Sequence, residues 1–241
     1  MNISRVCRVV VCVLALTMAT ANAQKASGPE REGVVRHMHD HVDSVDDIRS
    51  AIIAGNLAGV REPAKWLASH EVVAGLPGGW EEFVAVMRSN ARRIAGAQSL
   101  VAASYETGNL ALACANCHRA NNVQMDIKRV EIPPDELEDV ATHMQRHRWA
   151  ADRMWEGLYG PSEYAWNEGV DMLLDVALRP GEVAPGHGGG HGELGRLERE
   201  VHLIGSRGIV ASTPQQRSQI YGEYLSLCAS CHTTLKIGPS K

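Results

Sequence analysis

One five-residue pattern occurs twice in this chain of 241 residues and constrains its fold more than any other feature. Two cysteines separated by two residues are followed directly by a histidine: Cys114, Cys117 and His118, then Cys228, Cys231 and His232. The pattern CxxCH is the attachment signature of c-type haem. Two thiols one helical turn apart can form thioethers with one porphyrin, and the next residue binds the iron as proximal ligand. The sequence therefore predicts two covalently bound haem c groups.

Other uses of paired cysteines fit this sequence less well. A redox-active CxxC pair needs no following histidine and lies at a helix N-terminus in a βαβ unit, a context this sequence lacks. A single zinc site built from both pairs is conceivable, but zinc ribbons hold their two pairs closer together in sequence. The six cysteines are also too sparse for a disulfide scaffold in a chain of this length.

The first 23 residues have the features of a secretory signal peptide. Arg5 and Arg8 supply a positive start, residues 9–19 an apolar core, and residues 21–23 a small-x-small cleavage pattern. A membrane span needs about 20 apolar residues, and we find no stretch of that kind. We therefore expect residues 1–23 to be removed and the mature protein to be exported to the periplasm without a membrane anchor.

The composition excludes several classes of protein. Apolar residues make up 44% of the chain, enough for a sizeable core, while aromatic residues make up only 5%, which disfavours an all-β domain. The formal charge of −4 gives no basic face for a nucleic acid. Negative charge favours a basic partner, and we expect that partner to be a periplasmic or membrane-bound redox protein.

An internal repeat divides the chain into two similar halves. Residues 36–41 resemble residues 142–147 at an offset of 106, whereas the CxxCH motifs recur at an offset of 114. The second half is therefore about eight residues longer than the first between these two features, and we place the extra residues in the Gly- and Pro-rich segment 179–192. A period near 110 is that of a domain, not of a solenoid unit.

The position of each motif within its half predicts the architecture. The second motif is followed by only nine residues, so the protein that faces its haem must come from upstream. We expect an all-α protein of two tandem four-helix bundles, each with a C-terminal CxxCH helix. The predicted boundaries are 28–121 for the first bundle, 122–135 for a linker and 136–236 for the second bundle.

Periodic apolar positions predict individual helices within these bundles. One helix is expected to cover residues 34–52, its counterpart residues 140–158, and a third residues 80–101. Thr213, Pro214 and Gln216 form a helix start with a capping box before the second motif. Asn109 is the expected cap of the helix that carries the first motif.

Each half resembles a cytochrome c′-type (class II) c-type cytochrome. The resemblance rests on a first helix that bears the distal residues, on CxxCH near the end of a fourth helix, and on residues 55–57, which resemble the family's "GDL" turn. It covers nearly all of residues 30–120 and 136–235. It implies covalent haem c, export and electron transfer, and in some members a five-coordinate iron that binds NO or CO.

The distal ligand of each iron stays open at this point. The candidates shared by both halves are Met38 and Met144, His41 and His147, and His37 and His143. Methionine ligation would give six-coordinate haems of raised potential. The family's register instead places Val35 and Ala141 at the distal position, and neither side chain can bind iron. His187 and His191, in a glycine-rich stretch, are read as part of a flexible loop.

These observations together predict a periplasmic dihaem electron carrier that is not an enzyme. The alternative is a haem-based sensor or binder of small gas ligands such as NO and CO, with a vacant distal site.

Overall fold

The computed structural model describes residues 28–74, 76, 78–134, 140–175 and 192–237. These residues form eight α-helices and no strand, which confirms the expected all-helical class. The predicted signal peptide, His187 and His191 lie outside the described residues. The helices are α1 (Gly28–Ile53), α2 (Arg61–Ser69), α3 (Glu81–Ala95), α4 (Leu100–Ala120), α5 (Val140–Tyr159), α6 (Glu163–Asp175), α7 (Glu193–Val210) and α8 (Pro214–Leu235).

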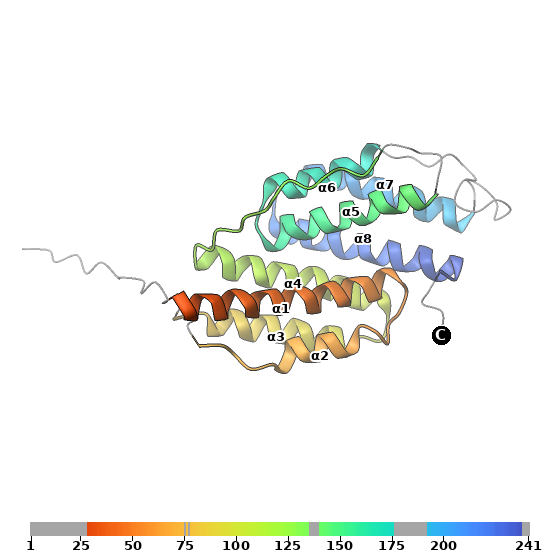
Figure 1. Cartoon of the computed structure of the whole chain (residues 1–241). Coiled ribbons are helices and arrows are strands. Elements are labelled where there is room, and N and C mark those ends of the chain that lie inside the picture. Colours follow the sequence, from red (N-terminus) through yellow and green to blue (C-terminus); the bar gives the residue numbers. More distant parts are fainter. Residues whose placement is uncertain (1–27, 75, 77, 135–139, 176–191, 238–241) are drawn as a thin grey trace, which may run out of the picture.

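The two halves of the chain pack side by side through their last helices. Helices α4 and α8 lie in the middle of the molecule, with α1 to α3 on one side and α5 to α7 on the other (Figure 1). The contact between α4 and α8 is the most extensive of all helix pairs, and α1 also reaches α8 while α5 reaches α4. The segment after α4 is non-helical over residues 123–134 and returns along α5, where Trp149 Nε1 donates to the Glu131 carbonyl.

The internal repeat predicted from sequence is visible in the pattern of burial. Positions of α1 recur on α5 at an offset of 106: Val45, Ile48, Arg49 and Ile52 correspond to Ala151, Met154, Trp155 and Leu158. Positions of α3 recur on α7 at an offset of 114: Met87, Asn90, Ala91 and Ile94 correspond to Val201, Ile204, Gly205 and Gly208. The extra eight residues therefore lie between the end of α5 and the start of α7.

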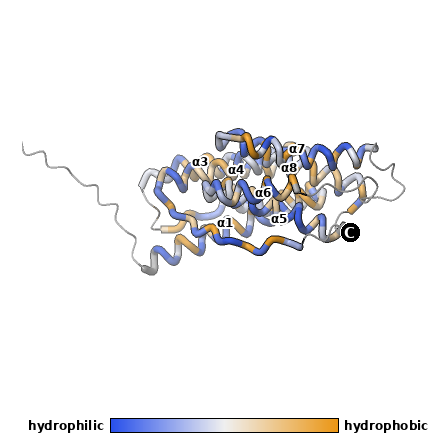
Figure 2. The backbone as a smooth tube through the Cα atoms, turned by 90° about the horizontal axis from the view of Figure 1, so that it is seen from above, coloured by the Kyte–Doolittle hydropathy of each residue, from blue (hydrophilic) through white to orange (hydrophobic). Residues whose placement is uncertain are grey.

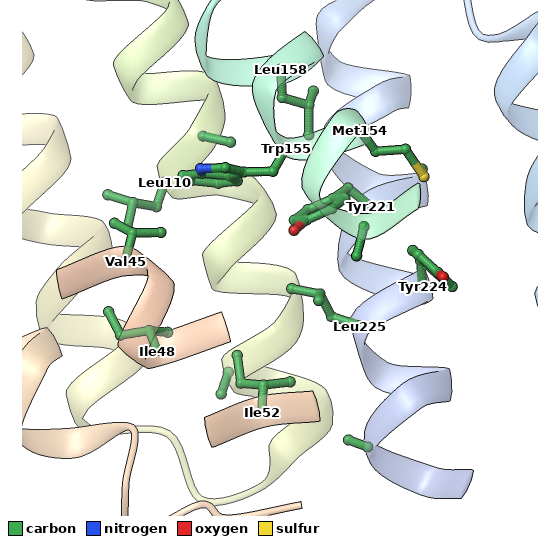
Figure 3. Packing of buried hydrophobic residues seen from close by; sticks show 14 of the residues in the cluster. Val45, Ile48, Ile52, Leu110, Met154, Trp155, Leu158, Tyr221, Tyr224 and Leu225 are labelled. Atoms are coloured by element: carbon green, nitrogen blue, oxygen red, sulfur yellow. The ribbon is translucent and has the colours of Figure 1, made fainter. Parts of the chain in front are cut away.

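One hydrophobic core runs through both halves. Figure 3 shows Ile48 and Ile52 of α1 in one cluster with Leu110 of α4, Trp155 of α5 and Tyr221 of α8. All five side chains are almost entirely withdrawn from solvent. Burying side chains of this size contributes about 1.5–3 kcal/mol each, so the shared core stabilises the two halves as one unit.

Small residues allow α4 and α8 to approach closely. A Cβ atom on Gly108 would lie 2.3 Å from the carbonyl oxygen of Ser218, and one on Gly222 would lie 2.8 Å from the Cα of Tyr105. Gly108 and Gly222 are equivalent at the offset of 114. The two helices therefore cross, antiparallel, at a pair of glycines related by the internal repeat.

A buried arginine joins the two first helices across this arrangement. The guanidinium of Arg49 in α1 bonds to Asp46 of its own helix, to Asp152 of α5 at 2.5 Å and to the Tyr221 hydroxyl at 2.7 Å. It also lies over the ring of Trp155, 5.4 Å from the ring centroid. Trp155 occupies the position in the second half that is equivalent to Arg49 in the first. The cation of one half therefore packs on the aromatic ring at the matching position of the other half.

The helix starts show one correct prediction and one error. The capping box is confirmed, since Thr213 accepts from the Gln216 backbone and the Gln216 side chain accepts from the Thr213 backbone. Asn109 as a cap is wrong, because it lies inside α4. That helix begins instead after Ser99, whose hydroxyl accepts from Ala102 N. The predicted third helix is correspondingly shorter, because it ends at Ala95, directly before Gly96.

None of the helices in the described residues combines the length and apolarity that a membrane span requires. Figure 2 shows why, since hydrophilic residues are distributed along each helix between the hydrophobic ones.

Candidate functional site

The two CxxCH motifs occupy the last two turns of α4 and α8. All four cysteines are free thiols and half-buried. Burial, with the neighbouring cysteine as a smaller cause, raises the pKa of Cys114 and of Cys228 to about 12. Thiols that stay protonated at the C-terminal end of a helix are poor nucleophiles, unlike the activated cysteines at helix N-termini.

The histidine of each motif is oriented by the opposite half of the chain. His118 Nδ1 lies 2.7 Å from the carbonyl oxygen of Tyr159, the last residue of α5. The ring of His232 correspondingly bonds to the backbone of Ile53, the last residue of α1. Ile53 and Tyr159 are equivalent at the offset of 106. Because a carbonyl only accepts, Nδ1 of His118 carries the proton and Nε2 keeps its lone pair for a metal.

The turn after α1 packs directly against the end of α8. Gly55 has a φ of 72°, and a Cβ atom there would lie 2.8 Å from Thr233 Oγ1, one residue beyond His232. Glycine is needed at this position for both its backbone conformation and the close approach. The residues that resemble a "GDL" turn therefore lie against the second motif rather than the first.

The two motifs lie at opposite ends of the molecule. Helices α4 and α8 are antiparallel and cross near Gly108 and Gly222, each ten residues before the histidine of its motif. At a rise of 1.5 Å per residue, His118 and His232 are separated by about 30 Å along the helix axes. Figure 1 shows the two helices ending at opposite sides of the molecule.

A cluster of three histidines lies in the first half. His37 and His41 of α1 meet His70, which follows α2, and one ligand nitrogen from each lies within 4.8 Å of the others. His70 Nδ1 donates to the Trp66 carbonyl at 3.0 Å, and its Nε2 lies 2.7 Å from His41 Nε2. Burial, reinforced by repulsion from His70 and His37, lowers the pKa of His41 to about 3. The imidazoles are therefore neutral at physiological pH, as metal ligation requires.

A second cluster has the same composition in the second half. His143 and His147 of α5 meet His202 of α7, again with one ligand nitrogen from each within 4.8 Å of the others. His202 Nδ1 donates to the Leu173 carbonyl at 2.6 Å. The Nε2 atoms of His147 and His202 are buried without a hydrogen-bond partner. Burial holds the pKa of His147 well below its usual range, with smaller contributions from His143, His202 and the motif residue His232.

Two histidines of each cluster are equivalent in the repeat, but the third is not. His37 and His41 match His143 and His147 at the offset of 106. His70 follows α2, whereas His202 lies on α7, the counterpart of α3. At the offset of 114, the residue equivalent to His202 is Arg88, which donates to the His70 carbonyl. The same triad is thus assembled from different helices in the two halves.

The structure separates the predicted distal candidates. His37 and His143 are buried, while Met38, Met144, His41 and His147 are partly buried on the same helices. The histidines belong to the clusters, and the methionines do not. Val35 of the family register is exposed, and Ala141 is exposed as well. His70 and His202 were missed by sequence reasoning, because nothing in the sequence pairs His41 with a residue 29 positions later.

Within the described residues, two groups bring three or more His, Cys, Asp or Glu side chains close enough together to share a metal ion; these are the two histidine clusters, and neither includes a cysteine. The four cysteines therefore do not converge on one zinc site. In comparisons with protein families, curated proteins and solved structures, no family, relative or structural neighbour matches this chain.

Proposed function

We propose that this protein is a periplasmic dihaem c-type cytochrome that carries electrons between redox partners. The observation that carries the proposal is the double CxxCH motif, together with the hydrogen bond that orients the histidine of each copy. His118 already donates from Nδ1 to the Tyr159 carbonyl, which leaves Nε2 available to an iron. Metal-binding histidines in proteins are oriented by the same kind of hydrogen bond.

The residues present fit covalent haem c. Cys114 with Cys117, and Cys228 with Cys231, would form the thioethers, while His118 and His232 would bind the two irons. When bound, haem supplies one-electron chemistry, in which iron alternates between ferrous and ferric states. The protein holds each histidine against a carbonyl of the other half.

The proposed sixth ligands are Met38 and Met144. Both lie on the first helix of their half, outside the histidine clusters, and a thioether raises the potential of haem iron. Their helices begin at the end of the molecule where the corresponding CxxCH helix ends (Figure 1). Like the cytochromes c′ that the chain resembles, each half would then hold its haem against its fourth helix.

Absorption spectra of the haem-loaded protein, with and without CO, test this function. A carrier with methionine ligands gives sharp low-spin bands at both haems, reversible reduction and little change with CO. Rapid CO binding to a high-spin form at both haems would overturn the proposal in favour of a gas-binding protein. Met38→Leu and Met144→Leu should each convert one haem to the CO-binding form.

A further inference from the structure

We propose that each three-histidine cluster binds a divalent transition-metal ion, giving the protein two non-haem metal sites besides its haem motifs. The first site is His37, His41 and His70, and the second is His143, His147 and His202. This inference does not depend on haem attachment, because the ligand set includes no residue of either CxxCH motif.

The chemistry of the ligands determines the class of ion. Three imidazoles without a carboxylate select borderline-soft ions such as Zn²⁺ and Cu²⁺ over Mg²⁺ and Ca²⁺. Three nitrogens at about 2.0 Å from Zn²⁺ lie about 3.3 Å apart, so ligand atoms within 4.8 Å need to close only slightly. A three-histidine site leaves a fourth position for water or another ligand.

Hydrogen bonds already orient the third ligand of each site. His70 Nδ1 donates to the Trp66 carbonyl and His202 Nδ1 to the Leu173 carbonyl, so both rings direct Nε2 into their clusters. Outer-sphere bonds of this kind fix the tautomer of metal-binding histidines. Trp66 also stacks on His70, with ring centroids 4.4 Å apart, which restricts the ring further.

The second cluster contains two buried imidazole nitrogens without a hydrogen-bond partner. Nε2 of His147 and Nε2 of His202 are buried and have no hydrogen bond. An unsatisfied buried nitrogen costs about 1–3 kcal/mol, and a metal ion would remove that cost for both atoms at once. A structural role in the core would be served better by apolar side chains.

The two halves reach the same triad by different routes. Inheritance from one ancestral half would place the third histidine at equivalent positions, yet His70 follows α2 and His202 lies on α7. A triad reassembled from different helices indicates that the three imidazoles are needed together. Metal binding is the chemistry that requires three neutral imidazoles at such distances.

Zinc titration of the dihaem protein tests the proposal. After chelator treatment and dialysis against Zn²⁺, elemental analysis should find two zinc ions per chain beyond the haem iron. His70→Ala and His202→Ala should each lose one zinc, and the double variant both. His39→Ala is the matched control, because His39 is exposed on α1 outside the cluster, and it should keep two.

Two further measurements distinguish a loss of zinc binding from a loss of the fold. The fold of each variant is checked by circular dichroism, and bound zinc should raise the melting temperature of the wild type but not of the double variant. Zinc that binds equally to the double variant, or not at all to the wild type, would overturn the proposal. So would a low-spin to high-spin change in His70→Ala or His202→Ala, because the cluster would then serve the haem. Haem content, measured separately by pyridine haemochrome spectra, reports on the proposed cytochrome function.

Discussion

His118 donates a hydrogen bond from Nδ1 to the carbonyl oxygen of Tyr159 at 2.7 Å, and the two residues belong to different halves of the chain. The repeat places the equivalent bond between His232 and Ile53. Each proposed iron ligand is therefore oriented by the end of the other half's first helix. The two halves are coupled at the sites where function is proposed, so neither half is expected to retain its site geometry alone.

The first prediction concerns the close crossing of α4 and α8. Gly108→Ala places a methyl group where Ser218 O lies 2.3 Å away, and because that atom belongs to the backbone, the helices must separate. We expect a loss of about 2–3 kcal/mol in the free energy of unfolding. Gly33→Ala is the control, since a Cβ there has no neighbour within 4 Å and alanine favours a helix by about 1 kcal/mol. Urea unfolding of both variants measures the difference, and equal stability would show that the crossing is not close.

The second prediction concerns the contribution of the buried Arg49 to stability. Arg49→Met removes the partners of Asp46, Asp152 and the buried Tyr221 hydroxyl, so we expect about 2–3 kcal/mol of destabilisation. Arg93→Met is the control, because Arg93 pairs with Glu106 at the surface and should cost less than about 1 kcal/mol. Thermal and urea unfolding would report both values. A neutral Arg49→Met variant would mean that the cation is not needed between the halves.

The third prediction concerns the separation of the two CxxCH motifs. Sites about 30 Å apart along the helix axes are too far for strong electronic or magnetic coupling. Electron paramagnetic resonance of the oxidised protein should show two independent haem signals without spin–spin broadening. The double variant Cys228→Ala, Cys231→Ala should leave the potential of the first haem unchanged. A shifted potential or a coupled signal would place the haems closer together.

The fourth prediction concerns the effect of Arg88 on zinc binding at the first of the two proposed sites. Burial is the main cause that lowers the pKa of the three histidines in the first cluster, and the positive charge of Arg88 beside His70 adds a smaller lowering, whereas His202 occupies the equivalent position in the second half. We therefore expect zinc to bind the second cluster more tightly. Arg88→Gln should strengthen binding at the first cluster several-fold, by removing the repulsion of two like charges. Calorimetric titration would resolve the two affinities, and an unchanged first affinity would contradict this explanation.

Local sequence signals predicted much of the fold. The 3.6-residue period of apolar positions identified the helices that became α1 and α5, and Thr213 with Gln216 identified the start of α8. The start of α4 was missed because Ser99 and Asn109 are both good caps, and the choice depends on where α3 ends. Gly96 ends α3 there, which a continuous apolar period conceals.

The long-range part of the site could not be predicted in this way. The cysteines and histidines of the motifs are adjacent in sequence and carry their own signal. His70 meets His41 only because α2 folds back on α1, and His202 meets His147 only because α7 lies across from α5, with α6 and α8 each packed against both helices. The pairing of Arg49 with Trp155 likewise depends on how the halves cross, which no spacing within one half encodes.

The intact mass of the mature chain is the most direct test of the central claim. After periplasmic expression with the cytochrome c maturation machinery, we expect the mass of residues 24–241 plus two haem groups. Replacing Cys114 and Cys117 by alanine should leave one haem, and replacing all four cysteines should leave none. A chain with the mass of the unmodified protein, in cells that mature a control cytochrome, would contradict the account.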